Sequence, residues 1–331
     1  MPIARSPHDQ GPIDRLSDAS PISVVIAVRD AEQTIDDALR SALGQSSSAM
    51  EVIVVDDMSA DGTRRRVLDV MSDRVLLLDG EGRGVAAARN AGVRSASGEW
   101  VAFLDGDDRW KPDFLRLARK RIDQAPDAAA CFSAATPVDD AGLVVGRHDM
   151  RELVTLEELV CGRIVPTTSA TLVRRDVLLE CGGFFEGFRC LAGVEDLDLW
   201  WRVASRGPCV GVTIAKAVYV VHDDRDRTRS VESLRDLEHD RELVVKRLAA
   251  TGAPPALVRR GQAIMRARTG RYWLRAEQPA LARTASRSSL RARPTAEGFA
   301  TLALASAPSP LRKLMVRLRR RHRASGHLRG A

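Results

Sequence analysis

Apolar runs that end in acidic residues, and that alternate with helical segments, constrain the fold of this chain more than any other feature. Residues 22–28 (ISVVIAV) and 51–57 (EVIVVDD) are continuous runs rich in β-branched residues. Such runs are typical of strands that are buried on both faces. Residues 74–80 and 99–108 (EWVAFLDGDD) predict two further strands, and the apolar spacing in 31–45 is that of a helix between the first two.

Strands that alternate with helices predict an α/β fold, here a three-layer α/β/α sandwich with a mostly parallel central sheet. Ligands of such sheets bind outside the carboxyl ends of the strands. Later segments are expected to add a helix over 111–125, with Pro112 in its first turn, and strands over 129–142 and 143–150. A helix over 194–207 should end at Gly207. The acids at or just after the expected strand ends are Asp30, Asp56, Asp57, Asp105 and Asp107.

Composition narrows the class of protein. Apolar residues make up 44% of the 331 residues, enough for a large core. No run of eighteen apolar residues appears, so we expect no membrane span, and residues 1–20 lack the apolar segment of a secretory signal and read as a flexible leader. The five cysteines are odd in number and form no CxxC pair, which favours a reducing, cytoplasmic setting.

The charge of the chain is divided unevenly along its length. Residues 251–331 contain 18 Lys or Arg and two acids, a balance of +16, and the net charge of +7 therefore leaves −9 for residues 1–250. In residues 311–323 (LRKLMVRLRRRHR) the apolar side chains fall on one helical side among arginines. This segment could lie on an anionic membrane surface, or it could be a solvated helix that packs on the body. Scarce aromatic residues argue against nucleic acid as a partner.

The tetrad DGDD follows the fourth expected strand. Asp105 and Asp107 could hold Mg²⁺ or Mn²⁺, because these hard cations prefer carboxylate and phosphate oxygens, and the metal would then bind a diphosphate. The alternative is a simple turn, in which Asp108 caps the next helix. The other acidic strand ends favour the metal site.

Two more acidic segments allow both a functional and a structural interpretation. Asp56 could accept hydrogen bonds from a nucleotide base or ribose, whereas Asp57, Ser59 or Asp61 could cap the following helix. Glu195 and Asp196 open a helix, where acids stabilise the dipole, or one of them could be a general base in the cleft.

A loose dinucleotide fingerprint, Gly82-x-Gly84-x-x-Ala87, supports a competing function, that of an NAD(P)-linked oxidoreductase. The motif follows the third expected strand, whereas the fingerprint normally opens such a fold. Arg83 and Arg89 in the same stretch could face phosphates or lie on a solvated helix surface. His222, after the last expected strand, could be structural, a third metal ligand or a diphosphate contact.

Taken in order, these segments resemble the family 2 glycosyltransferases, which have the GT-A fold. The matching stretches are PISVVIAVRDAEQTIDDALRSALGQ, EVIVVDDMSADGT, GVAAARNAGVRSASGEWVAFLDGDDRWKPDFL, CGGF, EDLDLWWRV and YVVHDD. They span residues 21–230, which would form the catalytic domain after the leader 1–20, and residues 231–331 would be a helical, Arg-rich C-terminal extension.

The resemblance implies a metal-dependent and inverting transfer of a sugar from a nucleotide-diphospho-sugar to an acceptor hydroxyl, in the synthesis of a cell-envelope or secreted glycan. It implies that Asp105 and Asp107 form the DxD motif for Mn²⁺ or Mg²⁺, that Asp196 is the catalytic base with Glu195 as the fallback, and that His222 is a further metal ligand. Donor contacts would come from Val28, Asp30, Glu32, Asp56, Asp57, Arg83 and Asp105.

The acceptor implied by the resemblance is a glycan or a lipid-linked sugar, and the enzyme would be cytoplasmic and peripheral at the inner face of the plasma membrane. The chain departs from the family at Ala27-Val28-Arg29-Asp30, where Pro-x-Tyr-Asn is common, and at Met58, where the family has Gly. The absence of QxxRW weighs against a processive synthase. A non-catalytic module that binds nucleotide sugars is the remaining alternative.

Overall fold

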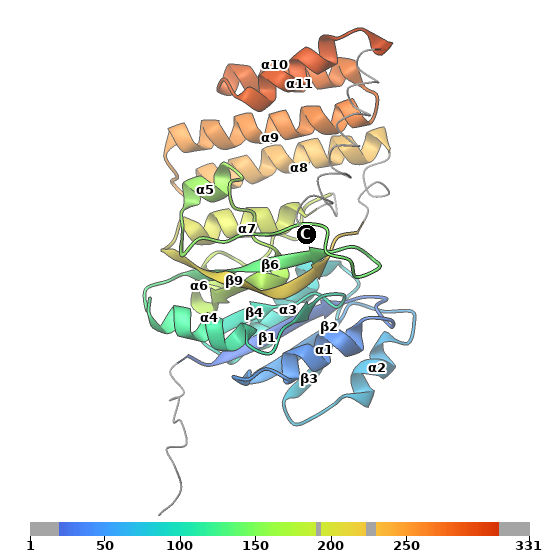
Figure 1. The fold of residues 1–331 in the computed structure, drawn as a ribbon, viewed down its shortest axis with the longest axis vertical. Coiled ribbons are helices and arrows are strands. Elements are labelled where there is room, and N and C mark those ends of the chain that lie inside the picture. Colours follow the sequence, from blue (N-terminus) through green and yellow to red (C-terminus); the bar gives the residue numbers. More distant parts are fainter. Residues whose placement is uncertain (1–19, 190–192, 223–229, 311–331) are drawn as a thin grey trace, which may run out of the picture.

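The computed structural model describes residues 20–189, 193–222 and 230–310. Within them a nine-stranded sheet is covered by helices on both faces, and a further stack of helices lies beyond one face (Figure 1). The strands are β1 (Ile22–Val28), β2 (Glu51–Asp56), β3 (Val75–Asp79), β4 (Trp100–Phe103), β5 (Arg109–Trp110), β6 (Ala130–Val138), β7 (Leu153–Val154), β8 (Thr171–Arg174) and β9 (Cys209–Val220). The helices are α1 (Ile35–Leu43), α2 (Thr63–Asp69), α3 (Val85–Ser95), α4 (Phe114–Asp123), α5 (Leu156–Val160), α6 (Arg175–Glu180), α7 (Val194–Ala204), α8 (Val231–Ala250), α9 (Pro255–Arg275), α10 (Pro279–Ala292) and α11 (Ala296–Ser306), with a 3₁₀ turn at Thr168–Ala170.

Strand directions decide which ends of the sheet can form a site. The strands pair in the order β3-β2-β1-β4-β8-β6-β9-β5, and β7 pairs with β9. Strands β1 to β4 are parallel, β8 is antiparallel to both β4 and β6, and β9 is parallel to β6. The carboxyl ends of β1, β2, β4, β6 and β9 therefore lie at one edge. The expected three-layer α/β fold is confirmed, with a mixed sheet.

The core explains why β1 is apolar throughout. Its seven residues are all buried. Val24 and Ile26 pack in a cluster with α1 and α4, whereas Val25 and Ala27 face the opposite layer, with α3 and α7. Successive side chains of a strand point to opposite faces, so a strand covered by helices on both sides has no polar face.

Three expected boundaries were wrong in detail. Residues 143–150 form no strand: after a turn in which Asp139 accepts the N–H groups of Ala141 and Leu143, they meet β6 through isolated bridges at Val144 and His148. Helix α4 begins at Phe114, so Pro112 precedes it. Helix α7 ends at Ala204 rather than Gly207.

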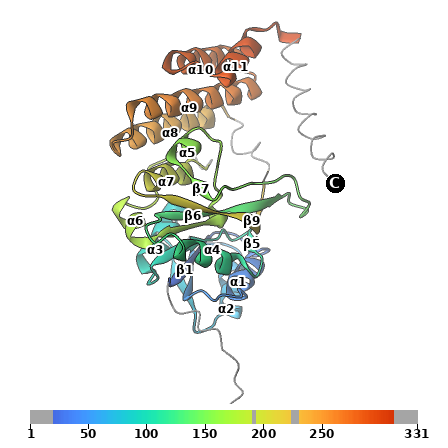
Figure 2. The ribbon, with the colours of Figure 1, turned by 60° about the vertical axis from the view of Figure 1, so that its left-hand side comes forward.

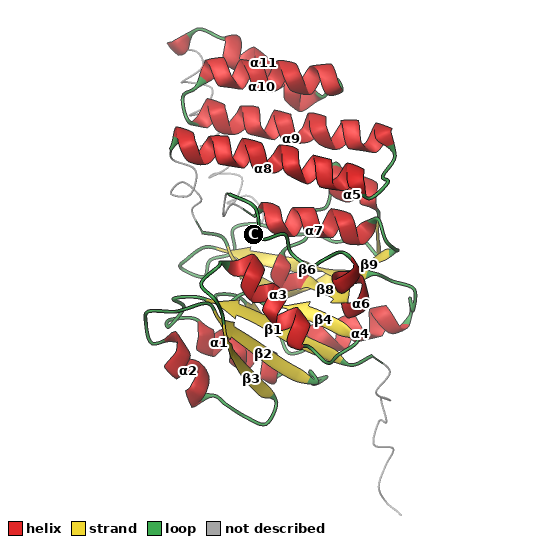
Figure 3. Cartoon of the chain, turned by 180° about the vertical axis from the view of Figure 1, so that it is seen from behind, coloured by secondary structure: helices red, strands yellow, loops and turns green. Residues whose placement is uncertain are grey.

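The C-terminal helices are packed on the α/β body and stack outward from α7 through α8 and α9 to α10 and α11 (Figures 2 and 3). One hydrophobic cluster contains Phe103 of β4, Trp200 of α7, Leu237 of α8 and Trp273 of α9. Asp198 of α7, which is 1% exposed, accepts a hydrogen bond from Arg247 Nε of α8 at 2.8 Å. The segments on either side of residue 230 thus share a core.

A shared core makes the C-terminal helices necessary for folding. We expect a chain that ends at residue 229 to accumulate as aggregated protein, because it would expose the apolar side of α7. The measurement is the soluble fraction after expression, with 8-anilinonaphthalene sulfonate binding as the readout for exposed apolar surface. A monodisperse 1–229 fragment with cooperative unfolding would contradict this expectation.

No helix among the described residues is long and apolar enough to cross a bilayer. Four of the five cysteines, Cys131, Cys161, Cys181 and Cys209, are free thiols. The leader and the basic segment 311–323 lie outside the described residues, apart from Ser20, so the membrane-surface expectation stays a prediction.

Candidate functional site

Acidic residues from separate strands meet at the shared carboxyl edge of the sheet. Asp56 ends β2, and Asp105 and Asp107 follow β4, which lies two strands away in the sheet. His222 follows β9 and reaches the same edge because β9 runs parallel to β6. The sequence-based expectation that these side chains share one edge agrees with the topology.

Arg89 of α3 joins the acidic strand ends to the start of α7. Its Nη2 atom lies 2.6 Å from Asp105 Oδ1, and its Nη1 atom lies 3.4 Å from Glu195 Oε1. The acid after β4 and the acidic pair of α7 are therefore parts of one cluster, although 90 residues of sequence separate Asp105 from Glu195.

Arg89 is a buried cation held by carboxylates. It is 5% exposed, and its guanidinium lies over the ring of Phe184 at 5.2 Å. Burial alone would lower its pKa, but the charges of Asp105 and Glu195 outweigh this effect and raise the pKa above its ordinary value. The solvated-surface alternative for Arg89 was wrong.

Asp196 lies in the first turn of α7, next to Glu195. Burial, together with repulsion from Glu195, raises the pKa of its carboxyl to about 8, and Arg89 opposes this shift. Its Oδ1 atom accepts the N–H of Leu197 at 2.5 Å, which leaves Oδ2 for another partner. A carboxylate with a raised pKa binds a proton more readily, as a general base must.

Asp107 contacts His222. His222 Nε2 is 2.7 Å from Asp107 Oδ2, and Nδ1 is 2.9 Å from Asp140 Oδ1. The hydrogen bond with Asp107 raises the pKa of the imidazole. Carboxylate oxygens and imidazole nitrogens are ligand atoms that suit Mn²⁺. In the described part of the chain, no three His, Cys, Asp or Glu side chains form a ready cluster for a metal, and Asp105 is paired with Arg89.

Asp108 has a structural partner that the sequence did not reveal. Its Oδ1 atom accepts the N–H of Val220 at 2.8 Å and so fastens the segment after β4 to the end of β9. The alternative in which Asp108 caps the following helix was wrong, since Asp113 occupies that position. Burial, with the charges of Asp105 and Asp107, raises the pKa of Asp108 to about 8.

Asp57 organises the glycine-rich segment. Its two carboxylate oxygens accept the N–H groups of Gly82 and Gly84, each at 2.8 Å. Both glycines have positive φ, 69° and 90°, a region that favours glycine. This loop geometry accounts for the Gly82-x-Gly84 motif without a dinucleotide.

Side-chain hydrogen bonds join the loop after β1 to the loop after β2. Asp30 Oδ1 accepts the N–H of Ala60 at 2.7 Å, and Glu32 Oε2 accepts the N–H of Gly62 at 3.1 Å. Asp61 accepts the N–H of Thr63 at 2.9 Å at the start of α2, as one capping alternative required. These contacts place Asp30 and Glu32 beside Asp56, with Val28 buried at the end of β1.

The environment of Asp56 leaves part of its carboxylate available. Oδ1 accepts the N–H of Ser59 at 3.0 Å, and Oδ2 is 3.9 Å from Arg64 Nη1. Two residues after Asp56, Met58 has a φ of 62°, in the left-handed region. The Gly that the family has at this position would adopt this conformation without strain.

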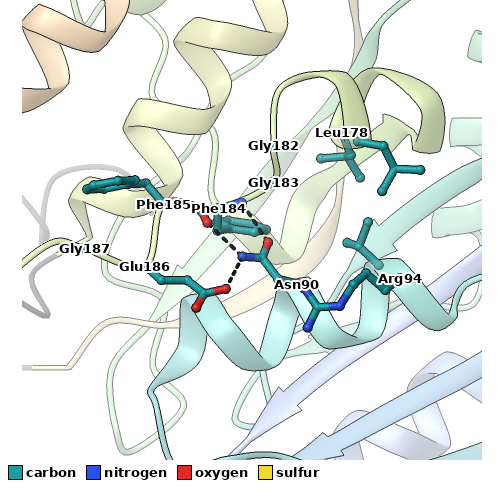
Figure 4. Close-up of a pocket in the computed structure, with 11 residues that line it drawn as sticks. Asn90, Arg94, Leu178, Gly182, Gly183, Phe184, Phe185, Glu186 and Gly187 are labelled. Atoms are coloured by element: carbon teal, nitrogen blue, oxygen red, sulfur yellow. Dashed lines mark hydrogen bonds between the residues drawn. The ribbon is translucent and has the colours of Figure 1, made fainter.

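Arg83 and Asn90 contact the segment that precedes α7. Arg83 Nη1 lies 2.9 Å from Glu186 Oε2, and Asn90 Nδ2 donates to Glu186 Oε1 and to the carbonyl of Phe184, each at 2.8 Å (Figure 4). A cavity of about 480 Å³ lies beside Asn90, lined also by Leu178. Its walls are mainly apolar, and neither Asp105 nor Asp196 lines it.

Comparisons with known proteins agree with this architecture. The solved structure of TarS from S. aureus has a TM-score of 0.63 at 19% identity, over 90% of this chain and 52% of TarS. TarS residues 1–349 in complex with UDP-GlcNAc give a TM-score of 0.62 at 18% identity, over 86% of this chain and 90% of that one. The fold is therefore that of the GT-A class.

The model for "Glycosyl transferase family 2" matches residues 23–190, and the chain belongs to this family. The succinoglycan biosynthesis protein ExoO of Rhizobium meliloti is 36% identical over 169 residues, 51% of this chain and 45% of ExoO. An Escherichia coli protein, the UDP-Glc:alpha-D-GlcNAc-diphosphoundecaprenol beta-1,3-glucosyltransferase WfgD, is 41% identical over 97 residues, 29% of this chain and 38% of WfgD. The matched part of the chain thus spans less than half the length of these two relatives.

Proposed function

We propose that this protein transfers a sugar from a nucleotide-diphospho-sugar to a hydroxyl of a cell-envelope glycan or lipid-linked acceptor, with inversion at the anomeric carbon and with Mn²⁺ or Mg²⁺. The observation that carries the proposal is the cluster in which Arg89 joins Asp105 to Glu195. A single guanidinium thus contacts both the DxD segment, at Asp105, and the acidic pair of α7, at Glu195. Family membership and the functions that the names of ExoO and WfgD state support the same class of reaction.

The donor would bind along the carboxyl edge of β1, β2 and β4. Asp56 Oδ2, which lies 3.9 Å from Arg64, would accept a hydrogen bond from the nucleoside, and the hydrogen-bonded loops with Val28, Asp30 and Glu32 would shape the base pocket. Arg83 would contact the donor from the glycine-rich loop. Asp57 would act indirectly, because its carboxylate holds the backbone of that loop. The UDP-GlcNAc complex of TarS supports a uridine nucleotide as the first donor to test.

A divalent cation would be held by Asp105, Asp107 and His222, and it would neutralise the charge of the leaving diphosphate. Asp196 Oδ2 would take the proton from the acceptor hydroxyl, and Glu195 is the second candidate for this role. Arg89 is a positioning residue, because it fixes Asp105 and Glu195 relative to each other. Residues 21–230 would carry the chemistry, and residues 231–331 would support α7 and, through the basic segment 311–323, could hold the enzyme at the inner face of the membrane.

A donor screen tests the proposal. We expect Mn²⁺-dependent release of UDP, GDP or dTDP with a hydroxyl acceptor, and we expect Asp107→Asn to lower this rate by at least about 10²-fold. Asp127→Asn, an exposed acid before β6 at the opposite edge, is the matched control and should keep the full rate. Nuclear magnetic resonance of the product would report inversion.

Two outcomes would exclude this function. Tight nucleotide-sugar binding without turnover of any donor would favour a non-catalytic module. Binding of NAD(P) in preference to UDP would revive the oxidoreductase alternative, although Asp57 already accounts for the glycine motif.

A further inference from the structure

A small cavity lies between the α/β body and the C-terminal helices, on the α7 side of the cluster formed by Arg89, Asp105 and Glu195. Its volume is about 110 Å³, well above the roughly 10–15 Å³ that one water requires. Asp196 lines this cavity together with Trp200 and Trp201 of α7, and the C-terminal helices contribute Arg241 and Arg268. Helices α5, α7, α8 and α9 lie next to one another around this region (Figure 3). The proposed base therefore faces a cavity that two arginines also line.

The two arginines have no carboxylate in an ion pair within the described residues. Arg241 is 9% exposed, and its Nη1 atom donates to Thr269 Oγ1 at 3.3 Å while the guanidinium lies 4.7 Å from the Tyr272 ring centroid. For Arg268 the structure gives no hydrogen bond or ion pair to a described side chain. The carboxylate that acts on Arg268 from a distance, Glu297, is paired with Arg271 at 2.6 Å.

The fold makes room for the Arg268 guanidinium. A Cβ atom at Gly162 would lie 1.9 Å from Arg268 Nη2 and would displace the guanidinium, and the φ of 62° at Gly162 is a conformation that favours glycine. Burial lowers the pKa of both arginines, which means that their positive charges are costly in the free protein. A ligand of opposite charge would offset the free energy that is lost by burying these cations.

Trp200 and Trp201 line the cavity with their ring carbons, because their indole nitrogens are buried away from it. Both Trp200 and Trp201 are 1% exposed, and neither indole Nε1 has a hydrogen-bond partner within the described part of the chain. Guanidinium groups can only donate, whereas phosphate oxygens can only accept when ionised. The guanidinium groups of Arg241 and Arg268 at the wall of one cavity fit an anionic, acceptor-rich group.

We propose that this cavity, bounded by Arg241, Arg268, Trp200 and Trp201, binds a phosphate group of the acceptor, so that the protein glycosylates acceptors that carry phosphate near the receiving hydroxyl. This inference rests on the proposed function, because Asp196 in the same cavity is the proposed base. The phosphate could belong to a lipid-linked sugar diphosphate or to a phosphodiester-linked polyol chain. Both present the same chemistry to the arginines.

The test compares three acceptors with the full chain. They share one receiving sugar or polyol and differ in the phosphate: a short-alkyl sugar diphosphate, a short polyol-phosphate oligomer and a neutral alkyl glycoside. We expect the wild-type protein to prefer one of the phosphate-bearing acceptors, and which one it prefers identifies the source. Arg268→Gln and Arg241→Gln should each raise the KM for that acceptor about 10–100-fold and leave the neutral acceptor unchanged.

A second readout separates ligand binding from a structural role. With UDP filling the donor site, short-alkyl diphosphate should raise the melting temperature of the wild-type protein but not that of Arg268→Gln. The variant alone should melt no lower than wild type, because it loses an unpaired buried charge rather than an ion pair. Arg259→Gln, an exposed position on the same helix, is the control and should keep both the acceptor preference and the thermal shift.

The outcomes distinguish this inference from the proposed function. Equal use of all three acceptors by wild type, or an unchanged preference in both arginine variants, would overturn the phosphate site while leaving glycosyl transfer intact. If wild type transfers to no acceptor, the proposed function fails. The melting temperature then tests the phosphate site by itself. A rise with short-alkyl diphosphate in wild type that is lost in Arg268→Gln supports the site, and no rise in wild type overturns it.

Discussion

Asp196→Asn should reduce sugar transfer by about 10²–10⁴-fold, because the amide cannot take the proton of the acceptor hydroxyl. The same substitution should raise the melting temperature. The folded-state pKa of Asp196, about 8, lies above its value in the unfolded chain, so its contribution to stability is fully present below pH 3.8 and is lost as the pH rises to 8. The gain from Asn should therefore grow between about pH 4 and pH 8.

Glu195→Gln is the matched control for the base. Glu195 contacts Arg89, so its neutralisation removes a favourable charge and should lower the melting temperature, opposite in sign to Asp196→Asn. Rates of nucleotide release and thermal unfolding curves at several pH values provide both measurements. Near-normal turnover of Asp196→Asn, with activity lost in Glu195→Gln, would assign the base to Glu195.

Arg89→Met should destabilise the protein by about 3–5 kcal/mol, as expected when one partner of a buried ion pair is removed. The substitution fills a similar volume but leaves Asp105 and Glu195 without their common cation. Urea unfolding measures the loss. Arg89→Lys keeps a charge but cannot reach both carboxylates as a guanidinium does, so it should recover only part of the stability.

Arg94→Met is the control for the length and charge of the side chain. Arg94 is exposed on the same helix, and its replacement should change the free energy of unfolding by no more than about 0.5 kcal/mol. A loss below 1 kcal/mol in Arg89→Met would mean that the bridge contributes little. A loss of the same size in both variants would attribute the effect to α3 rather than to the cluster.

Much of the body could be predicted because its signals are local. The continuous apolar runs at 22–28 and 51–57 require burial on both faces, and only a sheet covered on both sides provides it. Parallel strands bring their carboxyl ends together, so the placement of Asp56 and Asp105 at one edge followed from the order of elements. The expected strand over 143–150 is reduced to isolated bridges at Val144 and His148, and the side-chain hydrogen bonds of Asp139 that form the preceding turn leave no trace in the hydrophobic pattern.

The partners of the charged side chains could not be predicted. Arg89 lies in GVAAARNAG, where alanines mark no clear apolar face, and its carboxylates are 16 and 106 residues away in the chain. Asp57 resembled a helix cap or a donor ligand, yet it holds the N–H groups of Gly82 and Gly84, 25 and 27 residues away. The arginines of α8 and α9 gave no signal at all in a segment rich in arginine.

The sequence alone thus determined the layers, the direction of the first strands and the edge where the acids gather, because periodicity and strand polarity act over a few residues. Only the tertiary structure decided which acid meets which cation, that Asp196 has a raised pKa, and that Arg241 and Arg268 border its cavity. These properties depend on burial and on charges a few ångströms apart in space, which are set by segments distant in the chain.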